Sequence, residues 1–152
     1  MEHGDALPDV TVTLVDGAIL ALPSLKGAPA IVYFYPKDDT PGCTREANDF
    51  SDLGEAFAAS GATVIGISRD MPERHAKFAA KHGLTVRLAS DTDGSTCEAF
   101  GTWGEKQLYG KTHMGIERAT FLFAADGTLA QVWRKVKVPG HAQAALAAVQ
   151  AL

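Results

Sequence analysis

The feature that most constrains the fold is a short apolar run that leads, after a polar loop, into a helix start. The run Ala30-Ile31-Val32-Tyr33-Phe34 is rich in β-branched and aromatic residues, which predicts a buried strand near residues 29–35. Thr40 is a residue type favoured at the N-cap of a helix, and Pro41 follows at the first helical position, where proline is also favoured. We therefore expect a helix that begins close to the end of a buried strand.

This helix start places a cysteine, Cys43, at the third helical position. Free backbone N–H groups and the helix dipole favour negative charge there, so the position favours the thiolate, which is the nucleophilic form of cysteine. The alternative interpretation is a buried apolar cysteine of the kind common in protein cores. Strand, cap and proline together favour the reactive interpretation.

The other periodic segments predict an α/β fold of one domain over residues 1–152. Val10, Val12 and Leu14 alternate with polar residues before an Asp-Gly turn, which predicts an N-terminal β-hairpin. Further strands are predicted near 64–67, 86–88, 118–123 and 129–133, and helices at 40–57, 70–83, 93–100 and 140–151. Strands that alternate with helices predict a parallel section, and the late hairpin adds an antiparallel one. The result is a mixed central β-sheet flanked by helices, the thioredoxin-like arrangement.

Composition limits the function classes. With 46% hydrophobic residues in 152, the chain can bury a core, and its net charge of −4 argues against nucleic acid as the main partner. The apolar runs are too short for a membrane span, and the first residues do not resemble a secretory signal. We therefore expect a cytoplasmic protein without a cofactor. Its two cysteines lack the spacing of a metal site.

The histidines do not predict a metal site either. His75 and His82 lie seven residues apart on one predicted helix and can share a face. Two helical turns are too far apart for both to bind one ion, so we expect surface positions for them.

The cysteine segment resembles a known active-site signature. Pro36-x-x-x-Thr40-x-x-Cys43 is similar to the signature of peroxiredoxins, the cysteine-based peroxidases, and the longer string from Tyr33 to Ala47 resembles their bacterioferritin comigratory protein, or peroxiredoxin Q, branch. The likeness continues through 66–68, 88–91, 100–106 and 110–122. The resemblance implies a thioredoxin-like fold and a thiol-dependent peroxidase that reduces hydrogen peroxide and organic hydroperoxides through a sulfenic acid at Cys43.

The resemblance also suggests roles for other residues. Arg118, at the start of a predicted strand, matches the arginine that peroxiredoxins place at the reacting sulfur. A guanidinium stays charged and offers several directed donors to a peroxide. The Thr40 hydroxyl can donate to the peroxide as well as cap the helix. Pro36 and Gly42 are expected to shape the substrate site, since proline fixes the loop and glycine permits close approach.

Three further residues are candidates for places around the site. Tyr35 is expected to form an apolar wall of the substrate site, and Trp103 is a second candidate for such a wall, although large aromatic residues are more often simply core. Glu46, one turn after Cys43, can hold Arg118 or lie in solvent.

The sequence does not determine which thiol reduces the Cys43 sulfenic acid. Many members of this branch carry a resolving cysteine at the position of Asn48 or of Ala79, and this chain has neither. Cys97 remains as a possible second redox cysteine. The leading hypothesis is a single-cysteine cycle with an external thiol, and a Cys43–Cys97 disulfide cycle is the alternative. A peroxide-sensing binding module is a third hypothesis.

The expected partners are peroxides and a thiol reductant. Thioredoxin, glutaredoxin with glutathione, or another small thiol are all compatible with the sequence, and we expect a monomer or a weak homodimer. A thiol-disulfide oxidoreductase is disfavoured, because that class generally uses Cys-x-x-Cys and this chain has Thr40 at the first of those positions.

Overall fold

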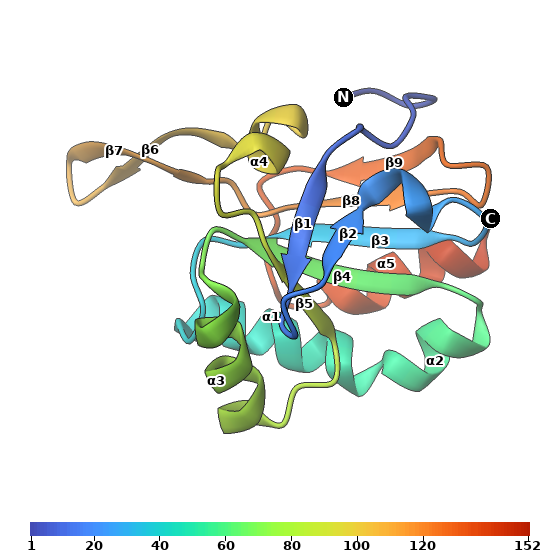
Figure 1. The fold of residues 1–152 in the computed structure, drawn as a ribbon, viewed down its shortest axis with the longest axis horizontal. Coiled ribbons are helices and arrows are strands. Elements are labelled where there is room, and N and C mark those ends of the chain that lie inside the picture. The colour runs from blue at the N-terminus through green and yellow to red at the C-terminus, as the bar shows by residue number, and fades with distance from the viewer.

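The fold is built on a seven-stranded mixed sheet (Figure 1). A computed structural model describes the backbone of residues 1–152 and every side chain except that of Leu108. The strand order in the sheet is β2-β1-β5-β4-β3-β8-β9. The strands are β1 (Thr11–Leu14), β2 (Ile19–Ala21), β3 (Ala30–Phe34), β4 (Thr63–Ser68), β5 (Arg87–Ser90), β8 (Ala119–Phe123) and β9 (Leu129–Trp133).

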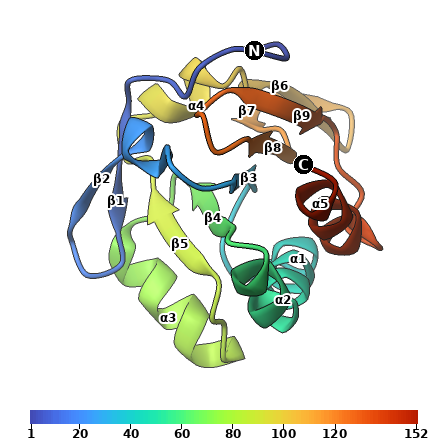
Figure 2. The same ribbon diagram turned by 90° about the vertical axis from the view of Figure 1, so that its right-hand side faces the viewer.

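Helices cover both faces of this sheet, as predicted. The helices are α1 (Pro41–Asp52), α2 (Gly54–Ala59), α3 (Pro72–His82), α4 (Ser95–Ala99) and α5 (His141–Gln150), with a 3-10 turn η1 at Leu22–Leu25. Figure 2 shows α1, α2, α3 and α5 together on one face, while α4 lies on the other. None of the helices in the described part of the chain has the length and apolar character needed to cross a bilayer.

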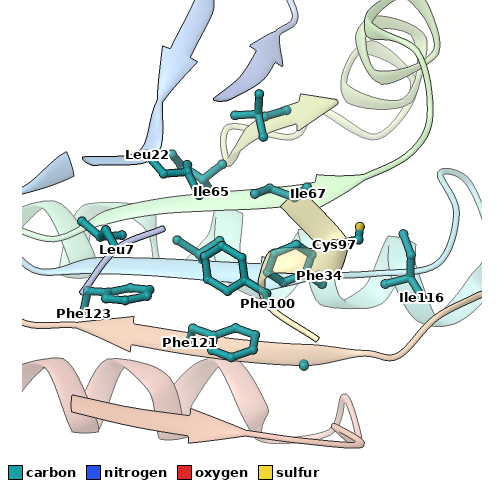
Figure 3. Packing of buried hydrophobic residues seen from close by; sticks show 14 of the residues in the cluster. Leu7, Leu22, Phe34, Ile65, Ile67, Cys97, Phe100, Ile116, Phe121 and Phe123 are labelled. Atoms are coloured by element: carbon teal, nitrogen blue, oxygen red, sulfur yellow. The ribbon is translucent and has the colours of Figure 1, made fainter. Parts of the chain in front are cut away.

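Strand β3 is an interior strand of the sheet, and its side chains enter both halves of the core. It pairs in parallel with β4 and antiparallel with β8. Because successive side chains of a strand point to opposite faces, Val32 and Phe34 pack into one cluster and Ile31 and Tyr33 into the other. The first cluster, drawn in Figure 3, lies on the α4 side of the sheet, and the second lies beneath α1, α3 and α5.

The first helix is shorter than predicted. The expected helix through Phe57 ends at Asp52, and α2 begins at Gly54 after an interruption at Leu53. A glycine at this point weakens helix propensity. Phe57 is nevertheless buried, so the apolar stripe continues across the interruption.

The third helix begins one residue later than its expected cap. Met71, not Asp70, occupies the N-cap, and the Asp70 carboxylate instead accepts hydrogen bonds from the Ser68 hydroxyl and the Asp38 backbone N–H. The C-terminal end was predicted correctly: Gly83 adopts the left-handed conformation (φ 63°) that commonly ends a helix.

The two predicted hairpins are present as β1–β2 and β8–β9, and the structure adds a third that was not predicted. Strands β6 (Trp103–Leu108) and β7 (Lys111–Ile116) pair antiparallel and form a separate two-stranded sheet. Figure 1 shows this hairpin extending away from the body of the molecule. We call it the β6–β7 arm.

Candidate active site

The site forms where the first turn of α1 meets the start of β8. Cys43 is 2% exposed, and Arg118 donates from Nη2 to its Sγ over 3.4 Å. The sheet register explains how residues so distant in sequence meet. Phe34, near the end of β3, pairs with Ala119, so Arg118 lies at the edge of the sheet where the chain leaves β3 for α1. The predicted partnership of Cys43 with Arg118 is therefore present in the structure.

Glu46 holds the other side of the same guanidinium. Arg118 Nη1 donates to Glu46 Oε1 over 2.7 Å, and the Glu46 side chain is 2% exposed. Glu46 thus holds Arg118, the first of the two alternatives raised by the sequence. Burial raises the pKa of Glu46 to about 7, against the opposing effect of the Arg118 charge, and Asp49 raises it slightly further.

Arg118 itself remains cationic in this setting. Burial lowers the pKa of Arg118, but the charges of Glu46 and Cys43 and the hydrogen bonds to both more than offset this, so the pKa is raised overall. The guanidinium therefore places a fixed positive charge in contact with the Cys43 sulfur.

Gly42 lies close to the arginine and leaves room for its guanidinium. A Cβ atom built on Gly42 would lie 3.2 Å from Arg118 Nη2, closer than most such contacts. The sequence led us to expect close approach of a substrate at Gly42. The structure places the guanidinium there, and the approach of a substrate at Gly42 stays a prediction.

Thr40 occupies the predicted N-cap but does not cap the helix with its side chain. Its backbone is extended, and its carbonyl accepts the first helical hydrogen bond, from Thr44 N–H over 2.9 Å. Its hydroxyl, however, donates backward to the Lys37 carbonyl over 2.9 Å. This bond tightens the turn ahead of α1, and the role of Thr40 toward peroxide stays a prediction.

Tyr35 forms a buried hydrogen bond to Asp38, and its predicted place in a wall of the substrate site stays a prediction. Its hydroxyl donates to Asp38 Oδ1 over 2.6 Å, and the residue is almost fully buried. Burial, then the neighbouring Tyr33 and Asp38, raise the pKa of Tyr35 well above its ordinary value. It therefore keeps its proton and acts as a donor to the loop that leads into α1.

Two hollows flank the β6–β7 arm next to the site. A pocket of about 440 Å³ is lined by Arg118 together with Trp103 and Val136. A second pocket, of about 480 Å³, is lined by Pro36, Lys37 and Trp103. Trp103 thus belongs to both hollows, and Arg118 connects the first one to Cys43.

Two aromatic neighbours of the site were not predicted as site residues. His141 is buried and hydrogen-bonds Thr120 Oγ1 over 2.8 Å; burial, then the Arg118 charge, lower its pKa to about 4, so it is neutral near pH 7. Tyr33 pairs with Thr120 across the strands, and burial and the charges of Glu46 and Cys43 raise its pKa. The alternation of β3 was the available signal for Tyr33, since it places Tyr33 on the α1 face.

The surface position predicted for His75 is wrong. His75 is fully buried, with Nδ1 2.6 Å from Asp38 Oδ2 and Nε2 3.0 Å from the Ala89 carbonyl oxygen. His82 is partly exposed and lies 2.7 Å from Asp39 Oδ1. The two histidines do share a face of α3, but each has an aspartate for its partner.

One cluster has the composition of a metal site. Ligand atoms of Asp38, Asp70 and His75 lie within 4.8 Å of one another. Their oxygens and nitrogens are already engaged: Asp70 Oδ2 accepts from Ser68 and from the Asp38 N–H, and Asp38 and His75 bind each other. The cluster is therefore described by its hydrogen bonds, and we assign no ion to it.

Cys97 lies on the opposite face of the sheet from Cys43. It is fully buried in the cluster with Phe34 and Phe100 (Figure 3), whereas Cys43 belongs to the cluster beneath α1. Burial raises the pKa of Cys97, and the Asp91 carboxylate raises it further. Asp91 also accepts the Cys97 backbone N–H over 2.7 Å. Both cysteines are free thiols, separated by the sheet.

Comparison with known proteins identifies the family of this chain. A model of the AhpC/TSA family matches residues 3–132, and the chain belongs to this family. It is 47% identical over 143 residues to the peroxiredoxin Bcp of Xanthomonas campestris, covering 94% of this chain and 89% of that protein. It is 46% identical over 146 residues to the peroxiredoxin Bcp of Bacillus subtilis, covering 96% and 93%.

A solved structure gives the same result for the fold. The bacterioferritin comigratory protein of Xanthomonas campestris superposes with a TM-score of 0.90 at 45% identity, covering 97% of this chain and 98% of that one. The class is therefore that of the peroxiredoxins, thiol-dependent peroxidases with a thioredoxin-like fold. Within this class the relatives place the chain in the bacterioferritin comigratory protein, or peroxiredoxin Q, branch.

Proposed function

We propose that Cys43 is the nucleophile of this peroxidase and that it works in a single-cysteine cycle. The observation that carries the proposal is the contact of Arg118 Nη2 with Cys43 Sγ at 3.4 Å, in the first turn of α1. In the first step the thiolate attacks one peroxide oxygen, an S–O bond forms and the O–O bond breaks. Sulfur is oxidised by two electrons to the sulfenic acid, and the leaving oxygen takes a proton to become water or an alcohol.

Arg118 supports this step electrostatically. The leaving oxygen develops negative charge, and a donor that is already fixed in place stabilises it without reorganisation. Glu46 keeps the guanidinium in position, since one Nη faces Glu46 and the other faces sulfur. Gly42 leaves room for that geometry.

An external thiol is the reductant that fits the two cysteine positions. A disulfide requires Cα atoms within about 7 Å, and Cys43 and Cys97 pack into clusters on opposite faces of the sheet. Attack by an external thiol on the sulfenic acid forms a mixed disulfide and releases water. A second thiol then frees Cys43 and leaves as an external disulfide. Thioredoxin, glutathione with glutaredoxin, or another small thiol can fill this role.

The test compares the parent with Cys43→Ser. The variant is expected to fold and to consume no peroxide, both in a single turnover and with a thiol reductant. Peroxide turnover by Cys43→Ser would overturn the assignment. A parent that reacts once with peroxide but cycles with none of the thiols would instead favour the peroxide-sensing module.

A further inference from the structure

Two residues of helix α3 contact two neighbouring aspartates in the loop between β3 and α1, the helix that carries Cys43. His75 contacts Asp38 and His82 contacts Asp39, at 2.6 and 2.7 Å. The two histidines lie seven residues apart, which places them on one face of the helix two turns apart. Asp38 and Asp39 stand directly before Thr40, the N-cap of α1. Both anchoring points therefore lie within five residues of the reacting cysteine in the sequence.

All the polar groups of Asp38 are bound to neighbouring elements. Oδ1 accepts from the Tyr35 hydroxyl and Oδ2 contacts His75. The backbone N–H donates to Asp70 over 2.9 Å, and the carbonyl accepts from Arg74 over 3.4 Å. Asp38 is 1% exposed. A buried polar network of this kind defines one geometry, because each unmade bond would leave a desolvated group without a partner.

The protons of the Asp38–His75 pair follow from its partners. His75 Nε2 faces the Ala89 carbonyl, which can only accept, so Nε2 carries a hydrogen. The contact between Nδ1 and Oδ2 needs a second proton, which resides on one of the two atoms. With two protons the pair has no net charge, which removes much of the cost of burying it. The bond to Ala89 also ties the pair to β5.

Asp39 is held in a less common conformation. Its φ of 60° lies in the left-handed region, which non-glycine residues adopt at some cost, though aspartate more readily than most. Lys81 and His82 both contact its carboxylate, at 2.8 and 2.7 Å. These bonds come from the last turn of α3 and oppose relaxation of the loop.

We propose that α3 positions the reacting cysteine through these contacts, with Asp38 and His75 as the principal positioning residues. The proposal rests on the proposed role of Cys43. Sulfur and guanidinium come from different elements, α1 and the start of β8, so their separation depends on where the loop places the first turn of α1. A misplacement of about 1 Å at a reacting centre can cost on the order of a hundredfold in rate.

The test measures the rate of sulfur oxidation in single turnover, with Cys43 intact in every variant. His75→Phe leaves Asp38 without its partner and is expected to slow the peroxide reaction by about tenfold or more. Alkylation by iodoacetamide should fall by less than about threefold, because it needs a thiolate but not an aligned peroxide. Asp38→Asn should stay within about threefold of the parent, since the amide can accept from Tyr35 and donate to a neutral His75.

Two controls separate positioning from stability. Lys77→Gln changes an exposed residue of α3 away from the loop, and Val149→Ala weakens the core under α5. Both should react at the rate of the parent, although Val149→Ala should melt at a lower temperature. If folded His75→Phe reacts within about twofold of the parent, or if Val149→Ala is slowed as much as His75→Phe, the proposal is overturned.

If His75→Phe does not fold, a variant at the surface of α3 tests the positioning proposal instead. Lys81→Ala with His82→Ala removes only partly or fully exposed side chains and should slow the peroxide reaction by about threefold or more. An unchanged rate would overturn the proposal. Failure of the proposed function is distinguishable from these outcomes, because it would appear in the parent as oxidation at a residue other than Cys43.

Discussion

Glu46 Oε1 and Arg118 Nη1 lie 2.7 Å apart, and the other guanidinium nitrogen of Arg118 reaches the sulfur of Cys43. Glu46 and Cys43 are three residues apart on α1 and therefore lie on one face of it. Arg118 comes from a distant part of the sequence and directly precedes β8, the strand that pairs with β3. The site thus consists of one cation shared by two acidic groups of a single helix turn.

Arg118→Met should slow the oxidation of Cys43 by peroxide roughly a hundredfold relative to the parent protein. This is the scale for losing one fixed electrostatic donor. Methionine keeps much of the length of the side chain but none of the charge. Stopped-flow measurement of peroxide consumption gives the rate. Arg87→Met, an exposed arginine on β5, is the matched control and should be unaffected. Equal rates for Arg118→Met and the parent would remove Arg118 from the mechanism.

Glu46 predicts a specific dependence of stability on pH. Its folded-state pKa of about 7 lies above the ordinary value of 4.5, so its contribution to stability is present below about pH 4.5 and is lost as the pH rises through 7. Glu46→Gln does not titrate. Relative to the parent, the variant should therefore gain on the order of 3 kcal/mol in free energy of unfolding between about pH 4.5 and about pH 8.

Urea unfolding of both proteins at the two pH values measures this change. Glu55→Gln, an exposed residue of α2, is the control and should show no comparable pH dependence relative to the parent. If the free energy of unfolding of Glu46→Gln differs from that of the parent by the same amount at both pH values, the Glu46 carboxyl titrates normally in the folded protein, which would contradict the prediction.

The Thr40 hydroxyl can be tested with two substitutions. Thr40→Val keeps the branched shape and should slow the peroxide reaction by about a hundredfold if the hydroxyl donates to peroxide, whereas Thr40→Ser should be mild. The bond from Thr40 to the Lys37 carbonyl is available to serine as well. If Thr40→Val reacts normally in stopped-flow, the hydroxyl serves only to tighten the turn.

The sequence was most informative where the signals are local. The N-cap position of Thr40, the proline that follows it and the place of Cys43 in the first helical turn follow from neighbours in sequence. Strand β8 begins at Ala119, one residue after Arg118, where the strand was predicted to start. The strand pattern of β3 was equally clear, because a buried strand is apolar throughout.

The remaining features depend on distant partners or lack periodicity. His75 was expected at the surface because nothing near it in sequence shows that Asp38, 37 residues away, will meet it in the core. The β6–β7 arm extends from the body, so its strands bury little surface and show no alternation that predicts a strand. Trp103, at the start of this arm, lines both hollows next to the site, and its role as a wall of the substrate site stays a prediction.

Cys97→Ser should retain most peroxidase turnover with a thiol reductant. Cys97 is fully buried on the other side of β3, and burial and Asp91 keep its thiol protonated. The expected change is less than about twofold, within the usual range for a substitution remote from the chemistry. Steady-state turnover with thioredoxin and with glutathione measures it, and loss of turnover with both would favour the two-cysteine cycle.

The central claim is tested most directly by the intact mass of the protein after one equivalent of peroxide, measured without reductant. The single-cysteine account predicts a gain of one oxygen atom, located at Cys43 by peptide mapping. A loss of two hydrogen atoms, with a Cys43–Cys97 peptide in the non-reduced digest, would contradict it.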